Sequence, residues 1–242
     1  SNGYIYSRNA NPTSQQLERL LAELETGKDA IVLASGMSAA TATFMTLKSG
    51  DHVVAQSVMY WAIKKWLIGF ANQWGISVDF FDPEDTTSLK KLIRPGETKI
   101  VWIETPANPT FSCVDIAEVA KTVKGSGARL CVDSTIATPV LTRPIELGAD
   151  LVMHSATKYL NGHGDVTAGA LITAHDDEWW KQIRDIRSSH GKILSPSDAW
   201  LLLRGIRTLD LRVRQSCKSA MAIAKHFDSN GKIIEVLYPG LD

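Results

Sequence analysis

Seven short, continuously apolar runs alternate with helical segments along this chain, and this alternation limits the fold more than any other feature. The runs lie at residues 30–34, 52–55, 76–81, 99–103, 129–132, 151–153 and 168–173. Strands that are apolar on both faces are typical of parallel sheets covered by helices on both sides. We therefore predict an α/β fold with a mostly parallel, seven-stranded sheet between two layers of helices.

Apolar residues between these runs recur at helical spacing. The first predicted helix has Thr13 as its N-cap and Gln16 as the partner in a capping box, and further helices are predicted at 37–47, 61–74, 88–93 and 115–124. The chain is helix-rich from Asp176 onward, with a long helix predicted at 209–227.

The same pattern predicts how the chain divides. We expect residues 1–208 to form one large domain, with little of an N-terminal arm ahead of it. Residues 209–242 then form a linking helix and the start of a truncated C-terminal domain. Its first strand is predicted at the apolar residues 233–237.

Polar residues lie just after four of the apolar runs, at 35–36, 104–108, 133 and 155–158. In open α/β sheets, ligands bind beyond the carboxyl ends of the strands. The sequence therefore predicts a ligand site at this edge of the sheet, built from these four segments.

The composition disfavours several classes of partner. The 26 basic and 26 acidic residues cancel, so no strong field favours nucleic acid or an anionic membrane. No apolar run approaches the roughly 20 residues of a membrane span. Three cysteines without a Cys-x-x-Cys pair and six scattered histidines favour neither a disulfide framework nor a metal site. We expect a cytoplasmic protein without nucleic acid, membrane or metal partners.

The segment Ser155-Ala156-Thr157-Lys158 places an amine and two hydroxyls after a predicted buried strand. A lysine that loses solvation has a lowered pKa and an amine that attacks carbonyl groups, and the hydroxyls could bind a phosphate beside it. A solvated loop lysine is the competing interpretation. Serine β-lactamases share the Ser-x-x-Lys spacing, but their Ser-Asp-Asn and Lys-Thr-Gly motifs are absent here.

Two further features point to a bound group without identifying it. Asp133 ends an apolar strand, where a carboxylate needs a partner; a helix cap or a structural ion pair would also satisfy it. Residues 35–38, Ser-Gly-Met-Ser, lie between a predicted strand and a helix, where backbone N–H groups bind anions. Neither Gly-x-Gly-x-x-Gly nor a P-loop is present, so dinucleotide and nucleoside triphosphate sites have no support.

Together these segments resemble the transsulfuration, or Cys/Met-metabolism, enzymes of pyridoxal-phosphate (PLP) fold type I, in order and over nearly the whole chain. The matching segments are Tyr6-Ser7-Arg8, Asn11-Pro12-Thr13, Ser35-Gly36-Met37, Glu104-Thr105-Pro106-Ala107-Asn108-Pro109, Asp133-Ser134-Thr135, Ser155-Ala156-Thr157-Lys158-Tyr159, Gly162-His163-Gly164-Asp165 and Leu203-Arg204-Gly205-Ile206-Arg207-Thr208-Leu209.

This resemblance implies a catalytic role for Lys158, which binds the cofactor as a Schiff base and moves protons. It also gives a catalytic role to Tyr60, which stacks on the cofactor ring and takes a proton from the incoming amine. Asp133 pairs with the pyridine nitrogen, Thr135 is a further cofactor-binding residue, and Asn108 contacts the ring oxygen or the substrate carboxylate.

The resemblance also implies how the phosphate is held and how subunits associate. The amides of Gly36 and Met37 and the hydroxyls of Ser155 and Thr157 bind the phosphate. Tyr6 and Arg8 match residues that reach the phosphate of a neighbouring subunit, which implies a dimer at least, and we expect a homotetramer. The arginine that binds the substrate carboxylate is expected in the C-terminal domain, outside this chain.

The reaction implied by the resemblance acts on small amino-acid substrates. We expect γ-replacement of the cystathionine γ-synthase type, because the cysteine that lyases carry after the stacking tyrosine is absent from 61–65, Trp-Ala-Ile-Lys-Lys. Elimination by a methionine or cystathionine γ-lyase is the alternative, favoured by Gly164 in 162–165. An aminotransferase and a PLP-binding protein without turnover are further alternatives.

Overall fold

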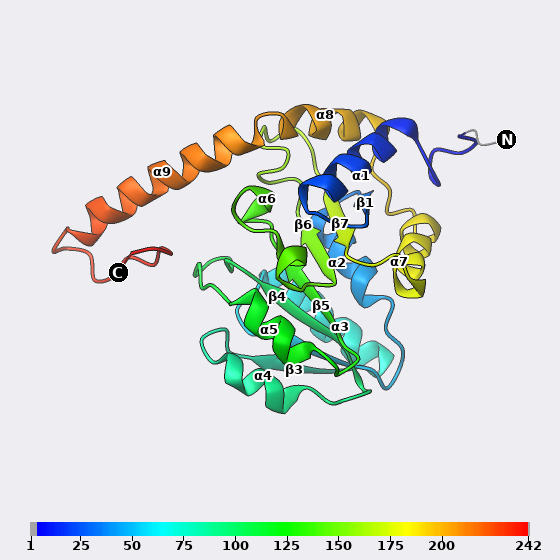
Figure 1. Ribbon diagram of the computed structural model, residues 1–242, viewed down its shortest axis with the longest axis horizontal. Helices are drawn as coiled ribbons and strands as arrows, with labels where there is room; N and C mark the ends of the chain where they lie inside the picture. Colours follow the sequence, from blue (N-terminus) through cyan, green and yellow to red (C-terminus); the bar gives the residue numbers. More distant parts are fainter. Residues whose placement is uncertain (1–3, 242) are drawn as a thin grey trace.

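The computed structural model describes residues 4–241, and its centre is one sheet of seven strands in the order β1-β7-β6-β5-β4-β2-β3 (Figure 1). The strands are β1 (Asp29–Leu33), β2 (His52–Gln56), β3 (Ser77–Phe81), β4 (Thr98–Glu104), β5 (Arg129–Asp133), β6 (Leu151–His154) and β7 (Gly169–Thr173). β7 runs antiparallel to its neighbours β1 and β6, while β6, β5, β4, β2 and β3 pair in parallel. The predicted fold class is confirmed.

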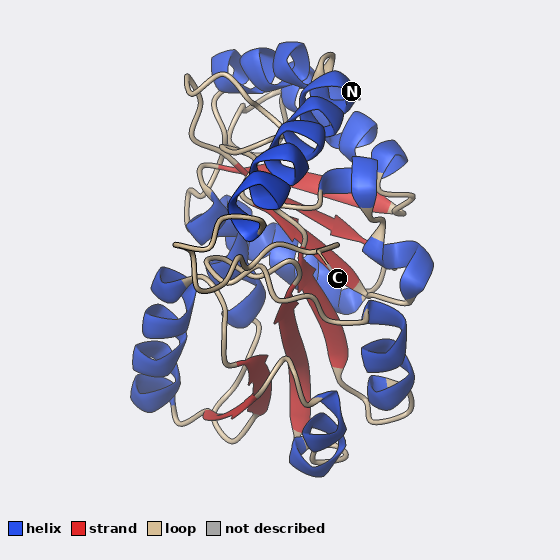
Figure 2. Cartoon of the chain, turned by 90° about the vertical axis from the view of Figure 1, so that its left-hand side faces the viewer, coloured by secondary structure: helices blue, strands red, loops and turns tan. Residues whose placement is uncertain are grey.

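Helices cover both faces of the sheet, as Figure 2 shows. They are α1 (Pro12–Leu24), α2 (Gly36–Phe44), α3 (Trp61–Trp74), α4 (Thr86–Leu92), α5 (Ile116–Val123), α6 (Thr138–Leu141), the 3-10 helix η1 (Pro144–Leu147), α7 (Glu178–Ser189), α8 (Pro196–Ile206) and α9 (Leu209–Asp228). Successive strand side chains point to opposite faces. Ile100 and Trp102 accordingly pack with α2, α3 and α7, while Val101 and Ile103 pack with α4 and α5.

Helix α1 begins two residues earlier than its predicted capping box requires. Asn11 is the N-cap, with an extended backbone, and its Oδ1 accepts the N–H of Thr13 at 2.9 Å. Pro12 occupies the first helical position, where its missing N–H leaves no hydrogen bond unmade. The prediction of Thr13 as N-cap is therefore wrong. Helix α4 begins at Thr86 rather than residue 88, because Asp85 caps it through the N–H of Thr87.

The long helix predicted near the end of the chain is confirmed as α9, which extends away from the sheet in Figure 1. The strand predicted at 233–237 is wrong for the part of the chain that the structure describes, where these residues form no strand. A strand needs a neighbour to pair its backbone groups, and none of the sheet strands among residues 4–241 pairs with this segment. The proposed domain boundary at 208/209 stays a prediction.

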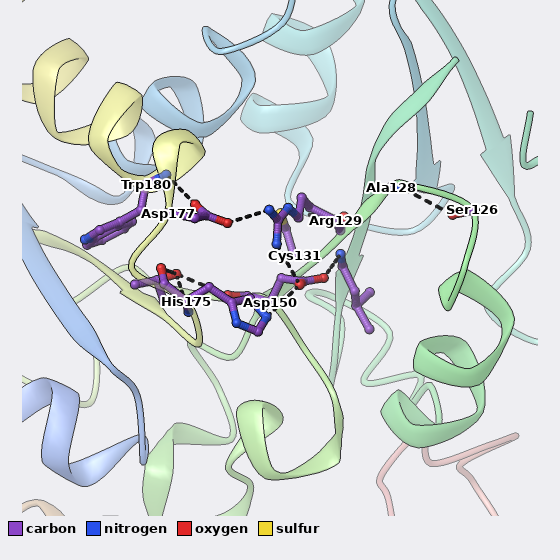
Figure 3. A network of polar contacts seen from close by, with 10 residues as sticks. Ser126, Ala128, Arg129, Cys131, Asp150, His175, Asp177 and Trp180 are labelled. Atoms are coloured by element: carbon purple, nitrogen blue, oxygen red, sulfur yellow. Dashed lines mark hydrogen bonds and ion pairs between the residues drawn. The ribbon is translucent and has the colours of Figure 1, made fainter. Parts of the chain in front are cut away.

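A polar network joins the amino ends of β5 and β6 to α7 (Figure 3). The guanidinium of Arg129 lies 3.3 Å from Asp150 Oδ1 and 2.5 Å from Asp177 Oδ2. His175 Nε2 lies 3.2 Å from Asp150 Oδ1, and Asp177 Oδ1 accepts the N–H of Trp180 as the N-cap of α7. These residues lie at the sheet edge opposite the predicted ligand site, so we assign them a structural role.

Replacing Asp177 with alanine is expected to lower the free energy of unfolding by about 1 kcal/mol, the usual cost of losing a helix N-cap. Burial opposes its ionisation, but the N–H of Trp180 and the Arg129 guanidinium hold the pKa of Asp177 below its usual value. Its contribution is therefore present above the unfolded pKa and lost as pH falls through the folded pKa. Urea unfolding against pH measures this. Asp176→Ala is the control, because Asp176 is exposed, and equal effects of the two changes would contradict the assignment.

Candidate active site

A cavity of about 390 Å³ opens at the carboxyl ends of the central strands, where the sequence places the ligand site. Nine of the eleven predicted site residues line it: Gly36, Met37, Tyr60, Asn108, Asp133, Thr135, Ser155, Thr157 and Lys158. These residues come from segments more than a hundred positions apart in the chain, and only the parallel sheet brings them together.

Asp133, the last residue of β5, is buried at the floor of this cavity with 4% of its surface exposed. Its Oδ1 accepts the backbone N–H of Thr135 at 3.0 Å and the Thr135 hydroxyl at 2.5 Å. No hydrogen bond from residues 4–241 reaches Oδ2. Burial raises the pKa of Asp133, and the two bonds from Thr135 oppose that shift. A buried carboxylate with an open oxygen favours a cationic N–H partner such as a protonated pyridine nitrogen.

The amino end of α2 faces the same cavity and has the features of an anion site. Ser35 caps the helix through the N–H of Ser38, and the N–H groups of Gly36 and Met37 have no helical carbonyl to bond. A Cβ at Gly36 would lie 2.8 Å from Ser155 Cβ, so only glycine allows this close approach. The arrangement suits a phosphate beside Ser155.

Thr135 and Thr157 fix the backbone around Ser155. The Thr135 hydroxyl accepts the Ser155 N–H at 2.8 Å, which ties the turn after β6 to Asp133. The Thr157 hydroxyl donates to Ala168 O at 3.1 Å and accepts the Ala168 N–H at 3.0 Å. Thr157 can therefore donate to a phosphate only if its hydrogen turns away from Ala168.

Lys158 lies in a turn after β6 whose backbone is well fixed. Its N–H donates to Ser155 O at 3.0 Å, and its carbonyl accepts the N–H of Gly162 at 2.7 Å. Its side chain is exposed. Within residues 4–241, this exposure favours the competing interpretation of a solvated lysine over a lysine desolvated by burial behind the strand. The amine lines the cavity but is not withdrawn from solvent by this chain.

Glu104 lies in the predicted segment 104–108, but the sequence reasoning gave it no role of its own. It ends β4, lines the cavity and is 5% exposed. Its Oε2 accepts the N–H of Tyr60 at 2.6 Å, and its Oε1 accepts the N–H of Asn108 at 2.8 Å. Burial, and then the neighbouring Asp133, raises the pKa of Glu104 to about 7. Like Asp133, it is a carboxylate that closes an apolar strand, and that pattern could have identified it.

Tyr60 precedes α3, and its ring lies 6.2 Å from that of Trp61, edge to face. Ile63, in the first turn of α3, also lines the cavity. Lys64 donates to Ser57 O at 2.7 Å, lies over the Phe80 ring and does not line the cavity.

Tyr6 and Arg8 are the two predicted site residues that do not line this cavity. Both are exposed, and the Arg8 guanidinium lies over the Tyr6 ring at 5.1 Å from its centroid. Their predicted contact with the phosphate of a neighbouring subunit stays a prediction.

Among residues 4–241, no three His, Cys, Asp or Glu side chains gather as they would around a metal ion. None of the described helices is long and apolar enough to cross a membrane.

Comparison with known proteins points to one family. Residues 1–242 match the model of the family described as Cys/Met metabolism PLP-dependent enzymes. The chain is 39% identical over 99% of its length to a probable cystathionine γ-synthase of Herpetosiphon aurantiacus, and 42% identical over 98% to a cystathionine γ-lyase of Bacillus subtilis. These matches cover 74% and 62% of the two relatives.

A solved structure gives the same result for the fold. The chain superimposes over its whole length on metB from Corynebacterium glutamicum, with a TM-score of 0.96 and 38% identity, and covers 62% of that protein. The chain therefore spans about two thirds of the length of such relatives.

Proposed function

This chain belongs to the family of Cys/Met metabolism PLP-dependent enzymes, and we propose that it forms the cofactor-binding part of an enzyme that replaces a group on the γ-carbon of an activated homoserine. The observation that carries this proposal is one cavity that joins an amine, a buried carboxylate and a helix amino end. Lys158, Asp133 and Gly36 supply these three parts.

The residues of the cavity fit pyridoxal phosphate. Asp133 Oδ2, which accepts no hydrogen bond from residues 4–241, would pair with a pyridinium N–H, and the amides of Gly36 and Met37 at the amino end of α2 would hold the phosphate. When bound, the cofactor supplies an electron sink that stabilises negative charge on the substrate carbons. Its protein partners must therefore keep the ring nitrogen protonated and the phosphate fixed.

The chain's own residues then move protons and orient the substrate. The Lys158 amine is the mobile base that carries protons among the α-carbon, the β-carbon and the cofactor. The Tyr60 hydroxyl takes the proton of the incoming amino group. Asn108 contacts the ring oxygen or the substrate carboxylate from the loop after β4.

Replacement is proposed ahead of elimination because the first turn of α3, which borders the cavity through Ile63, carries no cysteine. The lyase alternative rests on the 162–165 segment, with Gly164, and the relatives include both reaction types. Aminotransfer, or cofactor binding without turnover, would leave the γ-substituent in place.

The proposal is tested with the full-length protein, wild type and Lys158→Ala, loaded with pyridoxal phosphate. Wild type is expected to show the absorbance band of the bound cofactor, and borohydride is expected to trap that cofactor on Lys158. Wild type is also expected to convert an O-acylhomoserine and cysteine to cystathionine. Oxobutanoate and ammonia as main products would favour elimination. Lys158→Ala is expected to lose the trapped adduct and at least about a thousandfold of the rate, since it removes the only mobile base assigned.

Lys65→Ala is the matched control, because Lys65 is an exposed lysine that does not line the cavity. It is expected to behave as wild type. Trapping of the cofactor on another lysine in the wild-type protein would overturn the assignment of Lys158. A trapped adduct on Lys158 without release of any γ-substituent would leave the cofactor site intact and contradict the proposed reaction.

A further inference from the structure

The carboxylate of Glu104 connects two segments that the cavity needs but that the sheet itself does not hold. Tyr60 lies 44 residues before Glu104 in sequence, at the start of α3, and Asn108 lies in the loop after β4. Each carboxylate oxygen accepts one backbone N–H, at 2.6 Å from Tyr60 N and 2.8 Å from Asn108 N. One side chain thus sets the separation of these two segments.

A second contact reinforces the connection at the same strand end. The Glu104 N–H donates to Gln56 Oε1 at 3.2 Å, and Gln56 Nε2 donates to Val58 O at 2.7 Å. Gln56 is fully buried at the end of β2. The segment leading to Tyr60 is therefore held to β4 through a side chain from each of the two strands.

The cost of placing this carboxylate argues for a specific role. Glu104 is buried beside the acidic Asp133, its partner in the β4–β5 register, and within residues 4–241 it has no basic partner. A buried carboxylate without a cation is destabilising unless hydrogen bonds compensate. Charge-assisted bonds to backbone N–H groups are the strong kind that can do so. An uncharged side chain would avoid the cost of the buried charge but could not accept both N–H groups in the same way.

We propose that Glu104 is a positioning residue whose ionised carboxylate holds the Tyr60 and Asn108 segments at the separation that points their side chains into the cavity. The proposal rests on the proposed function only for what Tyr60 and Asn108 do once they are placed. The connection itself is a property of this chain.

The charge of Glu104 gives the proposal a pH signature. Burial and Asp133 raise its pKa to about 7, so a proton binds just below neutral pH and turns one acceptor oxygen into a donor. The other titratable groups that face this region are Asp133 from β5, Tyr60 at the start of α3, and Lys158 and Tyr159 from the turn after β6. Protonation weakens one of the two bonds to the amides and loosens the connection.

The test follows the backbone amides of residues 60 and 108 by NMR in cofactor-free, full-length protein labelled with ¹⁵N-tyrosine and ¹⁵N-asparagine. Both amide signals are expected to titrate together with a midpoint near the Glu104 pKa of about 7, and Glu104→Gln is expected to abolish this titration. Glu84→Gln, at an exposed position outside the cavity, is expected to leave it unchanged.

A second variant keeps the test decisive if Glu104→Gln folds poorly. Glu104→Asp retains the charge but is one methylene shorter, so it is expected to keep one of the two amide titrations and lose the other. With cofactor bound, both variants are expected to keep the cofactor that borohydride traps on Lys158. Their kcat/KM is expected to fall about tenfold, or about 1.4 kcal/mol.

The outcomes separate the two proposals. Amides that do not respond to pH, or that respond equally in Glu104→Gln, overturn the positioning role whatever the enzyme catalyses. Normal amide titrations in a protein that turns over no γ-substituted amino acid leave Glu104 as proposed and contradict the proposed function instead.

Discussion

Asp133→Asn is expected to lower kcat/KM by at least about a hundredfold, or about 2.7 kcal/mol of transition-state stabilisation, while the cofactor is still trapped on Lys158. Asparagine has nearly the same shape as aspartate but carries no charge, so the substitution tests the charge of Asp133 alone. The bonds from Thr135 go to Oδ1, and the amide oxygen of asparagine can accept both of them. What is lost is the negative charge that keeps a pyridine nitrogen protonated.

The same substitution has a second expected result that needs no catalysis. Burial raises the pKa of Asp133 in the cofactor-free protein. Between the unfolded and the folded pKa, the folded chain therefore holds a proton that the unfolded chain has released. This carboxyl therefore lowers the free energy of unfolding as pH rises from the unfolded to the folded pKa. Asp133→Asn is expected to flatten that dependence and to lower the pKa of Glu104, because Asp133 is one of the groups that raise it.

Urea unfolding against pH and steady-state kinetics measure these two effects. Thr135→Val is the comparison, because it removes one hydrogen bond to Asp133 but not its charge; we expect a loss of about tenfold. A change in kcat/KM below about threefold for Asp133→Asn would mean that its charge does not act on the cofactor.

Burial explains which parts of the fold and site could be predicted from the sequence. The runs at 99–103 and 129–132 are apolar on both faces, and only a covered parallel sheet suits them. Asp133 and Gly36 follow from the same argument, because ligand-binding residues gather at the carboxyl ends of such strands. These predictions depend on local pattern, and the structure places both residues at the cavity.

The errors concern features that local pattern does not determine. Local pattern marks Glu104 as a carboxylate that closes an apolar strand, but its proposed role depends on the N–H of a residue 44 positions away. The exposure of Lys158 depends on what covers the turn, not on the strand before it. Residues 233–237 are apolar enough for a strand, but pairing needs a neighbour. Thr13 fits the capping pattern as well as Asn11 does, and Pro12 decides between them.

The second large expected effect concerns how two subunits share one site. It involves the exposed segment at residues 4–9, called the arm below, which carries Tyr6 and Arg8. Neither residue lines the cavity of its own chain, yet the resemblance assigns both to a phosphate. Both statements hold if Tyr6 and Arg8 contact the phosphate bound in a neighbouring subunit. Arg8→Ala and Lys158→Ala are therefore each expected to be nearly inactive when expressed alone in the full-length protein, for defects that belong to two different subunits of one site.

Co-expression of these two variants is expected to restore about a quarter of the wild-type activity, because that share of sites pairs an intact Lys158 with an intact Arg8 from its neighbour in a random mixture. Asp133→Asn with Lys158→Ala is the control. Both of these residues line the cavity of one chain, so no site in that mixture has both intact and no activity should return. Absence of recovery with Arg8→Ala would contradict a role of the arm in a neighbouring subunit. Recovery in the control would contradict the premise that Asp133 and Lys158 of one site come from the same chain. Cofactor affinity, measured on the separate variants, is then expected to fall for Arg8→Ala, since the substitution removes the guanidinium that the resemblance assigns to the phosphate, a group that arginine can bind bidentately.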